Sequence, residues 1–264
     1  MTKTIVVSGG TDGMGRAIAL ARAARGDEVI TLGSNPVKGA ETPNFVRVDL
    51  SDLEDTRNAT AAIAEKWPKI DALLLFANRQ APRREETKQG FEKTFALYYL
   101  SRYLLGRDLR PNLDRSGNPV IVNVAGVGIT KGGIAWDDLQ LTSGYSMLRA
   151  QLQAGRCNDL LGLIQRPNYV LCHPGFTRSG DLTPLPKPLR AAIRIAAKLK
   201  AQPVENAIRP IHDWIDDPPA DPLTAVDRGR KLSLDLPRLR EADAHRLAGA
   251  TERLLHRAGA AGSR

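Results

Sequence analysis

The residues with the clearest chemical potential lie near the start of the chain. Gly9, Gly13 and Gly15 stand in the run Ser8-Gly9-Gly10-Thr11-Asp12-Gly13-Met14-Gly15, after the apolar run Thr4–Ser8 and before a helical pattern. Glycines between a strand and a helix permit a tight turn and let backbone N–H groups approach a diphosphate at the positive end of the helix. An ordinary glycine-rich turn is the weaker alternative because the loop has this strand–loop–helix context. We therefore predict a dinucleotide phosphate site here.

Such a loop has to be held by a sheet, and the first two thirds of the chain alternate strand and helix patterns. This alternation is typical of a parallel sheet covered by helices on both faces. The fold class predicted is α/β, a doubly wound parallel sheet (Rossmann) with a C-terminal helical extension. The expected strands are short and rich in Val, Ile and Leu, as in buried parallel sheets; they cover Thr4–Ser8, Glu28–Leu32, Phe45–Val48, Ala72–Phe76, Val120–Val124 and Tyr169–Cys172.

Punctuating residues locate several helix ends. Gly26 is expected to end the first helix, and Ser51 or Asp52 to cap the helix that ends near Trp67. The proline-rich run 183–188 interrupts regular structure before a helix at about 189–200, and a last strand is expected at Leu223–Val226. Residues 1–264 are predicted to form a single domain, with 183–217 covering the substrate and 239–258 forming a C-terminal helix.

Composition narrows the classes of partner. The chain has 264 residues, 42% hydrophobic and 25% charged, which is ordinary globular composition. Its two cysteines, Cys157 and Cys172, have no metal-ligand spacing and suit a reducing compartment. Without a leader-like stretch or a long apolar run, we expect a cytoplasmic protein with no membrane contact. The net charge of +9 comes from arginines interleaved with acids, which indicates an anionic cofactor and a small-molecule substrate rather than nucleic acid.

Several motifs resemble those of the short-chain dehydrogenases/reductases. Gly9, Gly13 and Gly15 have that family's Gly-x-x-x-Gly-x-Gly spacing, with Ser8 where the family usually has Thr. The runs 134–139 (Ile-Ala-Trp-Asp-Asp-Leu) and 173–179 (His-Pro-Gly-Phe-Thr-Arg-Ser) resemble the retinol-dehydrogenase-like and WW-domain-oxidoreductase-like branch. The resemblance implies an oxidoreductase that binds a nicotinamide dinucleotide.

The resemblance also implies where the cofactor is held. It places Asp49 beside the adenine and the segment after the sixth strand on the nicotinamide side. The cofactor-binding residues expected from the loop and the resemblance are Ser8, Gly9, Thr11, Asp12, Gly13, Met14, Gly15, Ser34, Lys38, Asp49, Leu50, Ala77, Asn78, Pro174, Gly175 and Thr177.

The choice of coenzyme can be argued from charge. Enzymes that use NAD place an Asp or Glu at the end of the second strand, where it accepts from the ribose hydroxyls. Here that place holds Gly33 and Ser34, and the cations Lys38 and Arg16 are near in sequence. Asp12, before the second motif glycine, argues the other way. NADP(H) is therefore favoured over NAD(H).

The catalytic half departs from the family pattern. In the family a Tyr exchanges a proton with the substrate, and a Lys four residues later lowers its pKa, since a phenol near pKa 10 needs a cation to ionise. Tyr145 matches the Tyr, but Arg149 stands in the Lys position, and a planar guanidinium is not equivalent to an ammonium. Gly126 stands in the position of the catalytic Ser and Tyr98 in that of the Asn.

These departures leave three hypotheses for function. Loss of one oxyanion donor typically costs about 10²–10³ in turnover, so Tyr98 or Thr130 would have to supply a replacement hydroxyl. The first hypothesis is an NADP(H)-dependent oxidoreductase that reduces a carbonyl or oxidises an alcohol, with Tyr145 and Arg149 as catalytic residues. The second is a scaffold used for a non-redox step (cyclisation, isomerisation or elimination), and the third is a non-catalytic cofactor-binding protein.

Two further expectations concern side chains and assembly. His173 is expected to be structural, and the cations Lys187, Arg190, Arg194 and Lys198 to form a solvated face. Many members of the family pair through helices that correspond to residues 87–110 and 143–165. The resemblance therefore implies a homo-dimer or homo-tetramer.

Overall fold

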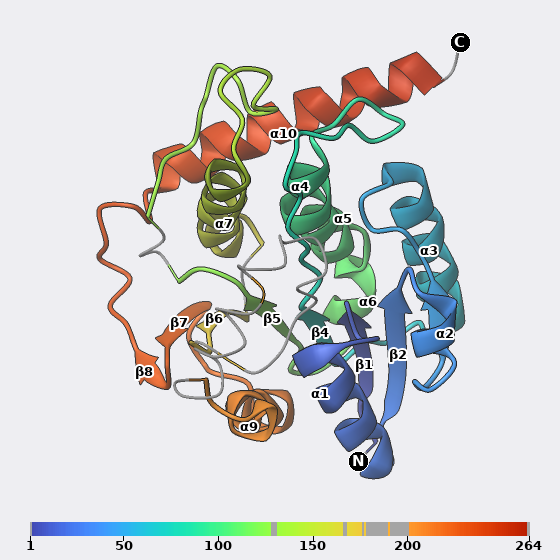
Figure 1. Ribbon diagram of the computed structural model, residues 1–264. Coiled ribbons are helices and arrows are strands. Elements are labelled where there is room, and N and C mark those ends of the chain that lie inside the picture. Colours follow the sequence, from blue (N-terminus) through green and yellow to red (C-terminus); the bar gives the residue numbers. More distant parts are fainter. Residues whose placement is uncertain are drawn as a thin grey trace.

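One mostly parallel sheet forms the centre of the computed structural model, which describes residues 2–127, 131–165, 168–175, 177, 190 and 201–262. Its eight strands have the order β3-β2-β1-β4-β5-β6-β7-β8; β1 to β7 are parallel and β8 is antiparallel (Figure 1). The predicted doubly wound α/β sheet is confirmed. The strands are β1 (Thr4–Ser8), β2 (Glu28–Gly33), β3 (Phe45–Arg47), β4 (Ala72–Leu75), β5 (Val120–Val124), β6 (Tyr169–His173), β7 (Leu223–Asp227) and β8 (Arg230–Lys231).

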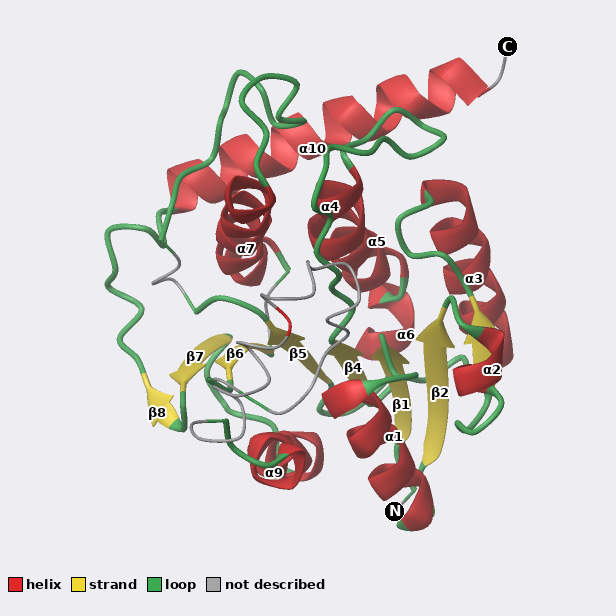
Figure 2. Cartoon of the chain, in the orientation of Figure 1, coloured by secondary structure: helices red, strands yellow, loops and turns green. Residues whose placement is uncertain are grey.

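Helices cover both faces of the sheet, so its strands are buried on both sides (Figure 2). One face carries α1 (Gly13–Ala24) and α9 (Val204–Asp216). The other carries α3 (Leu53–Lys66), α5 (Ser101–Asp108) and α7 (Met147–Ile164). The remaining helices are α2 (Pro36–Gly39), α4 (Lys93–Phe95), the π-helical turn η1 (Ala96–Leu100), α6 (Arg110–Asp114) and the long α10 (Glu241–Gly262).

The local signals in the sequence explain most helix boundaries. Asp52 accepts hydrogen bonds from the backbone N–H groups of Glu54 (3.0 Å) and Asp55 (3.2 Å), which confirms it as the cap of α3. Gly26 follows the end of α1 with φ +90°, the left-handed conformation that favours glycine. The expected strands agree with the observed ones to within a residue at most ends.

The segment predicted to cover the substrate, 183–217, is described only in part. Residues 183–189 and 191–200 lie outside the described residues, as does Thr130, while Arg190 is helical. The described part contains α9, which packs on the sheet through Ile208, Ile211 and Ile215. Whether the segment covers a substrate stays a prediction.

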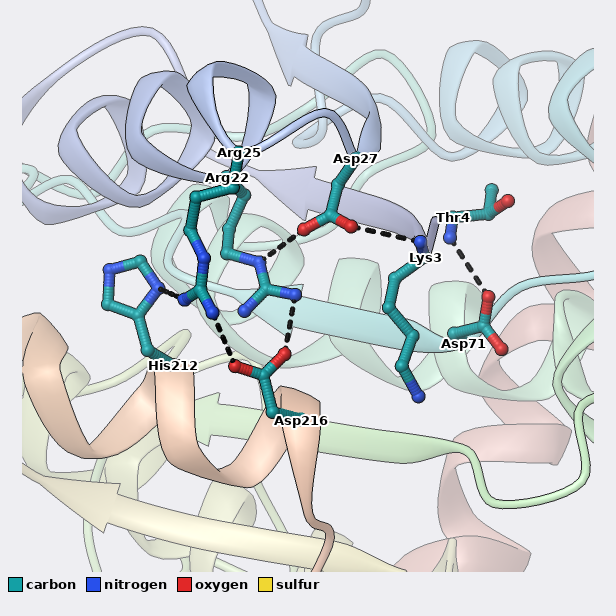
Figure 3. A network of polar contacts seen from close by, with 8 residues as sticks. All are labelled: Lys3, Thr4, Arg22, Arg25, Asp27, Asp71, His212 and Asp216. Atoms are coloured by element: carbon teal, nitrogen blue, oxygen red, sulfur yellow. Dashed lines mark hydrogen bonds and ion pairs between the residues drawn. The ribbon is translucent and has the colours of Figure 1, made fainter. Parts of the chain in front are cut away.

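An ion-pair network joins α1 to α9 at the amino ends of the strands (Figure 3). Arg22, only 2% exposed, contacts Asp27 at 2.6 Å and Asp216 of α9 at 2.7 Å. Asp216 also contacts Arg25 at 2.9 Å, and Asp27 accepts from the backbone N–H of Lys3 at 2.9 Å. The network therefore connects α1, the residue before β1 and α9 at the amino ends of the strands. The glycine loop lies at the opposite, carboxyl ends.

The C-terminal helix α10 lies across α7 and the η1–α5 helix (Figure 1). The buried Leu247 and Leu255 of α10 join the core, and the hydroxyls of Tyr99 and Thr251 are hydrogen-bonded at 2.8 Å. Within the described residues, every position of α7 from 153 to 162 is buried in the single chain. The predicted pairing through residues 143–165 could therefore not use positions 153–162 of α7, because the single chain already buries them.

Candidate active site

The glycine loop is shaped by steric limits that the sequence motif anticipates. Gly9 has φ +72° and Gly13 has φ +52°, and Asp12 caps α1 by accepting from the Gly13 N–H at 2.8 Å. A Cβ on Gly9 would lie 2.7 Å from the Ala77 backbone nitrogen, and a Cβ on Gly15 would lie 2.3 Å from the Gly9 carbonyl oxygen. Neither position can hold a larger residue without moving the backbone. These steric limits agree with the tight turn that the sequence predicts for a diphosphate-binding loop at residues 9–15.

The end of β2 has no room for an acidic side chain. A Cβ on Gly33 would lie 2.6 Å from the Thr11 methyl carbon and 2.8 Å from its hydroxyl oxygen. Ser34, the next residue, is exposed. Beyond it, Lys38 forms an ion pair with Asp12, so the cation and the anion that argued in opposite directions about the coenzyme are partners. Arg16 is likewise paired, with Glu41 at 2.7 Å.

The other predicted adenosine contacts lie beside this loop. Asp49 is exposed after β3, where its carboxylate accepts from the Ser51 backbone N–H (2.9 Å) and hydroxyl (2.7 Å). Leu50 is buried, and Met14 is half-buried on α1. Ser8 at the end of β1 accepts from the Ala77 N–H at 3.4 Å, which joins the loop to β4.

A fully buried arginine joins the ends of β4 and β5. Arg102 of α5 has 0% exposure, and its guanidinium donates to the carbonyl oxygens of Ala77 (2.9 Å) and Val124 (3.1 Å) and to the side chain of Asn123. Its guanidinium carbon lies 4.7 Å from the centre of the Tyr98 ring. The planar fork of an arginine suits this triple contact, which fixes two strand ends that border the predicted site.

The family's Asn position is rebuilt around Tyr98. This residue lies in the π-helical turn η1, and its side chain is buried against Arg102. Its carbonyl oxygen accepts from the amide of Asn158 on α7 at 2.7 Å. Burial raises the pKa of the Tyr98 phenol above its ordinary value, although Arg102 acts in the opposite direction. Tyr98 is therefore a core residue in this arrangement, and Asn158 binds its carbonyl oxygen inside the core.

Tyr145 and Arg149 are not brought into contact by a described hydrogen bond. Tyr145 precedes α7, and its hydroxyl donates to the Ala81 carbonyl oxygen at 2.7 Å. The Arg149 guanidinium donates backwards to the carbonyl oxygens of Ser143 (3.0 Å) and Gly144 (2.9 Å). Burial raises the pKa of the Tyr145 phenol, and Glu92 and Glu85 act in the same direction, whereas Thr94 and Arg84 lower it. In this geometry the phenol holds its proton.

Asn78 and Gln151 connect β4 to α7 next to the predicted nicotinamide side. The Asn78 amide nitrogen donates to Gln151 at 3.1 Å, and the Gln151 amide donates to Asn78 (3.3 Å) and to the Arg79 carbonyl oxygen (3.3 Å). Both side chains carry donors and acceptors at the carboxyl edge of the sheet.

The ends of β6 and β7 place an imidazole against a carboxylate. His173 Nδ1 lies 2.7 Å from Asp227 Oδ1, and Arg228 donates to the other carboxylate oxygen at 3.1 Å. A cavity of about 320 Å³ adjoins them, lined by His173, Pro174, Gly175, Gln202, Asn206 and Arg228. Pro174 and Gly175, both predicted to bind the cofactor, are thus at its wall, and Thr177 forms a bridge to Gln202.

Several residues of this edge carry no signal in the sequence. Arg102 lies in a helical segment with several tyrosines, a pattern that does not predict a buried arginine. Asn158 and Gln151 lie inside a helix in which polar and apolar residues are mixed. Asp227 is 54 residues from His173, and only the pairing of β6 with β7 brings them together. Only the register of β6 against β7 could have predicted that His173 and Asp227 are in contact.

A comparison with protein families decides the classification. The model described as short chain dehydrogenase matches residues 3–137, which include the glycine loop and β1 to β5. The chain belongs to the short-chain dehydrogenase family. The resemblance deduced from the glycine loop is confirmed.

Individual relatives agree with this assignment. Human retinol dehydrogenase 13 is 26% identical over 174 residues, which cover 61% of this chain and 51% of the relative. Human polyprenol dehydrogenase is 30% identical over 168 residues, 58% of this chain and 51% of the relative. The matched region thus spans about half the length of these relatives. Their names agree with the predicted oxidoreductase class and with the retinol-dehydrogenase-like branch.

Solved structures show the same fold along nearly the whole chain. A short-chain dehydrogenase from Streptomyces avermitilis aligns with a TM-score of 0.62 and 17% identity, covering 97% of this chain and 94% of that one. Solved structures of this fold include complexes with NADP and with NAD. The fold therefore binds nicotinamide dinucleotides. No helix in the described part of the chain is long and apolar enough to cross a membrane.

Proposed function

We propose that the chain is an NADP(H)-dependent oxidoreductase that reduces a carbonyl group or oxidises an alcohol of a small molecule. The observation that carries this proposal is the cradle at residues 9–15, where Gly9 and Gly15 leave no space for a Cβ. Membership of the short-chain dehydrogenase family supports the class of reaction. A bound nicotinamide coenzyme would supply or accept the hydride.

The residues that would hold the coenzyme follow the carboxyl edge of the sheet. The N–H groups at the start of α1 would bind the diphosphate, Asp49 and Leu50 would border the adenine, and Pro174 and Gly175 would border the nicotinamide. Tyr145 is proposed to lie beside the substrate and to orient it by hydrogen bonding; burial raises the pKa of its phenol above the ordinary value, which makes it a weaker acid. Arg149 would act on the coenzyme or substrate from the start of α7 rather than on Tyr145.

The preference for NADP(H) rests on the end of β2. Thr11 excludes a carboxylate from Gly33, so no acidic side chain at the end of β2 itself would repel a 2′-phosphate. Lys38 is paired with Asp12 but both side chains are about half exposed, so the lysine can turn toward a phosphate at small cost. Replacement of Lys38 by Ala should weaken NADPH binding by roughly tenfold, the value of one charge-assisted contact, and leave NADH binding unchanged.

The experiment that tests the function has two steps. Calorimetry with NADPH and NADH on folded protein measures binding, and absorbance of the reduced coenzyme with a panel of ketones and aldehydes measures hydride transfer. Binding of NADPH with turnover of a carbonyl is the expected result. Binding without turnover would favour the non-redox or non-catalytic alternatives, and no binding of either coenzyme would refute the proposal.

The oligomeric state remains a prediction. A dimer or tetramer is expected from the family. In the single chain, positions 153–162 of α7 are buried, whereas Leu148 and Arg149 in its first turn are exposed.

A further inference from the structure

A carbonyl reduction needs a proton donor beside the reacting oxygen, and this requirement rests on the proposed function. Ala125 and Gly126, after β5, bring no hydroxyl to that place. The Tyr145 hydroxyl is already donated to the Ala81 carbonyl oxygen at 2.7 Å, and Arg149 donates to backbone oxygens before α7. Another strand end therefore has to be considered as the source of the proton.

His173 lies next to the position that lacks its serine. Strands β5 and β6 are parallel, with Val124 paired to Cys172, and the Ala125 N–H donates to the Cys172 carbonyl oxygen at 3.0 Å. His173, one residue further along β6, therefore stands beside Ala125 and close to Gly126. The side chain is 47% exposed, and the residue is part of the wall of the cavity of about 320 Å³ between this edge and α9.

The imidazole is oriented by a carboxylate on the next strand. The register of β6 and β7 pairs His173 with Asp227, and Nδ1 lies 2.7 Å from Oδ1. Although burial acts in the opposite direction, hydrogen bonds from His173 and Arg228 hold the pKa of Asp227 below its ordinary value. The ionised carboxylate can only accept, so Nδ1 carries the hydrogen and Nε2 is the nitrogen left to exchange protons. The side chain of Asp227 is only 12% exposed, which shields this bond from water.

We propose that His173, oriented by Asp227, is the acid–base residue of this site. In the reducing direction, a bound reduced nicotinamide coenzyme would supply the hydride to the carbonyl carbon, the π electron pair would move to the oxygen, and that oxygen would take the proton from Nε2 of the imidazolium. The neutral imidazole then recovers a proton from solvent. In the oxidising direction the same nitrogen accepts the hydroxyl proton while the hydride leaves to the oxidised coenzyme.

The activity test uses two substitutions at one position. His173→Ala removes the proton donor, and His173→Gln keeps a donor toward Asp227 but cannot exchange a proton. Both should lower turnover by about 10²–10⁴-fold, the usual contribution of a general acid, with NADPH affinity within about threefold of the parent protein. Added imidazole should restore at least roughly a tenth of the lost rate in His173→Ala and none in His173→Gln, where the side chain fills the site. His245→Ala, an exposed histidine on α10, is the matched control and should change nothing.

A second readout does not depend on turnover. The chain has four histidines, so proton NMR of the coenzyme-free protein can assign a downfield Nδ1 proton to His173 by its loss in His173→Gln. The same signal should disappear in Asp227→Asn. Unchanged turnover in His173→Ala, or turnover that is lost in His173→Ala and not restored by imidazole, would overturn the assignment. If the parent protein binds NADPH but reduces no carbonyl, both this assignment and the proposed function fail. If the parent protein reduces a carbonyl and the His173 variants do so at the same rate, the assignment alone fails.

Discussion

The two halves of the sheet keep the family pattern to different degrees. In the half built from β1 to β4, the motif glycines Gly9 and Gly15 stand where any side chain would strike backbone atoms, as at Gly15 and the Gly9 carbonyl oxygen. In the half built from β5 to β7, three of the four family side chains are replaced, and Arg102, Asn158 and the pair His173–Asp227 occupy the surrounding positions. A binding loop defined by backbone shape has few substitutes. A proton-transfer group can be replaced from a neighbouring strand end.

The largest expected effect tests the shape-defined half. Gly15→Val should lower the affinity for NADPH by at least about 100-fold, because the added side chain displaces the backbone that would cradle the diphosphate. Calorimetry measures the loss, with circular dichroism to confirm folding. Gly117→Ala is the matched control, since a Cβ there meets no atom within 4 Å. Equal affinity in both variants would contradict the placement of the coenzyme.

The second prediction tests Arg102, which connects the end of β4 in one half to the end of β5 in the other. Arg102→Lys keeps a buried cation but loses the fork that reaches Ala77, Val124 and Asn123, so at least one acceptor is left without its donor. The free energy of unfolding should fall by about 2–4 kcal/mol, as measured by urea denaturation. Arg107→Lys, on the exposed side of α5, should change it by less than about 0.5 kcal/mol. Similar effects in both variants would mean that the strand ends do not depend on Arg102.

A gain of function tests the altered half. Gly126→Ser returns a hydroxyl to the position where the family places it, and should raise carbonyl turnover roughly tenfold, less than the 10²–10³ typical of an optimised donor. Gly117→Ser is the control. An unchanged rate together with unchanged NADPH affinity would indicate that the site has been rebuilt around other groups or for another reaction.

The smallest expected effect concerns the ion pairs that connect α1 to α9. Asp216→Asn weakens the contact of α9 with Arg22 and Arg25 of α1, and should lower stability by about 1 kcal/mol at neutral pH, since Asp216 is partly exposed. The hydrogen bond from Arg22 holds the pKa of Asp216 below its ordinary 3.8. The stabilisation is therefore present above that pH and is lost as the pH falls through the lower folded-state pKa. Urea denaturation of the parent protein, Asp216→Asn and the control Asp213→Asn across this range would show it; a pH-independent difference would contradict it.

Much of the fold could be predicted because its signals are local. The apolar runs of β1, β4 and β5 and the caps at Asp52 and Gly26 act within a few residues, so their positions agree with the sequence. Helix α9 has an apolar periodicity, but Pro203 and Pro210 obscure it, and β8 has only two residues. The glycine loop was predicted for the same local reason, whereas the contact of His173 with Asp227 depends on strand pairing, which no local pattern encodes.

The position of α10 has a consequence for how the chain reaches its native state during synthesis. Chains leave the ribosome from the N-terminus, and early domains commonly fold as units while translation continues. Here Leu247 and Leu255 complete a core that begins with residues of β1 and β2, so the flank of α7 stays uncovered until these residues of α10 have emerged. A ribosome-bound intermediate that ends before residue 240 should therefore expose this apolar flank and bind holdase chaperones.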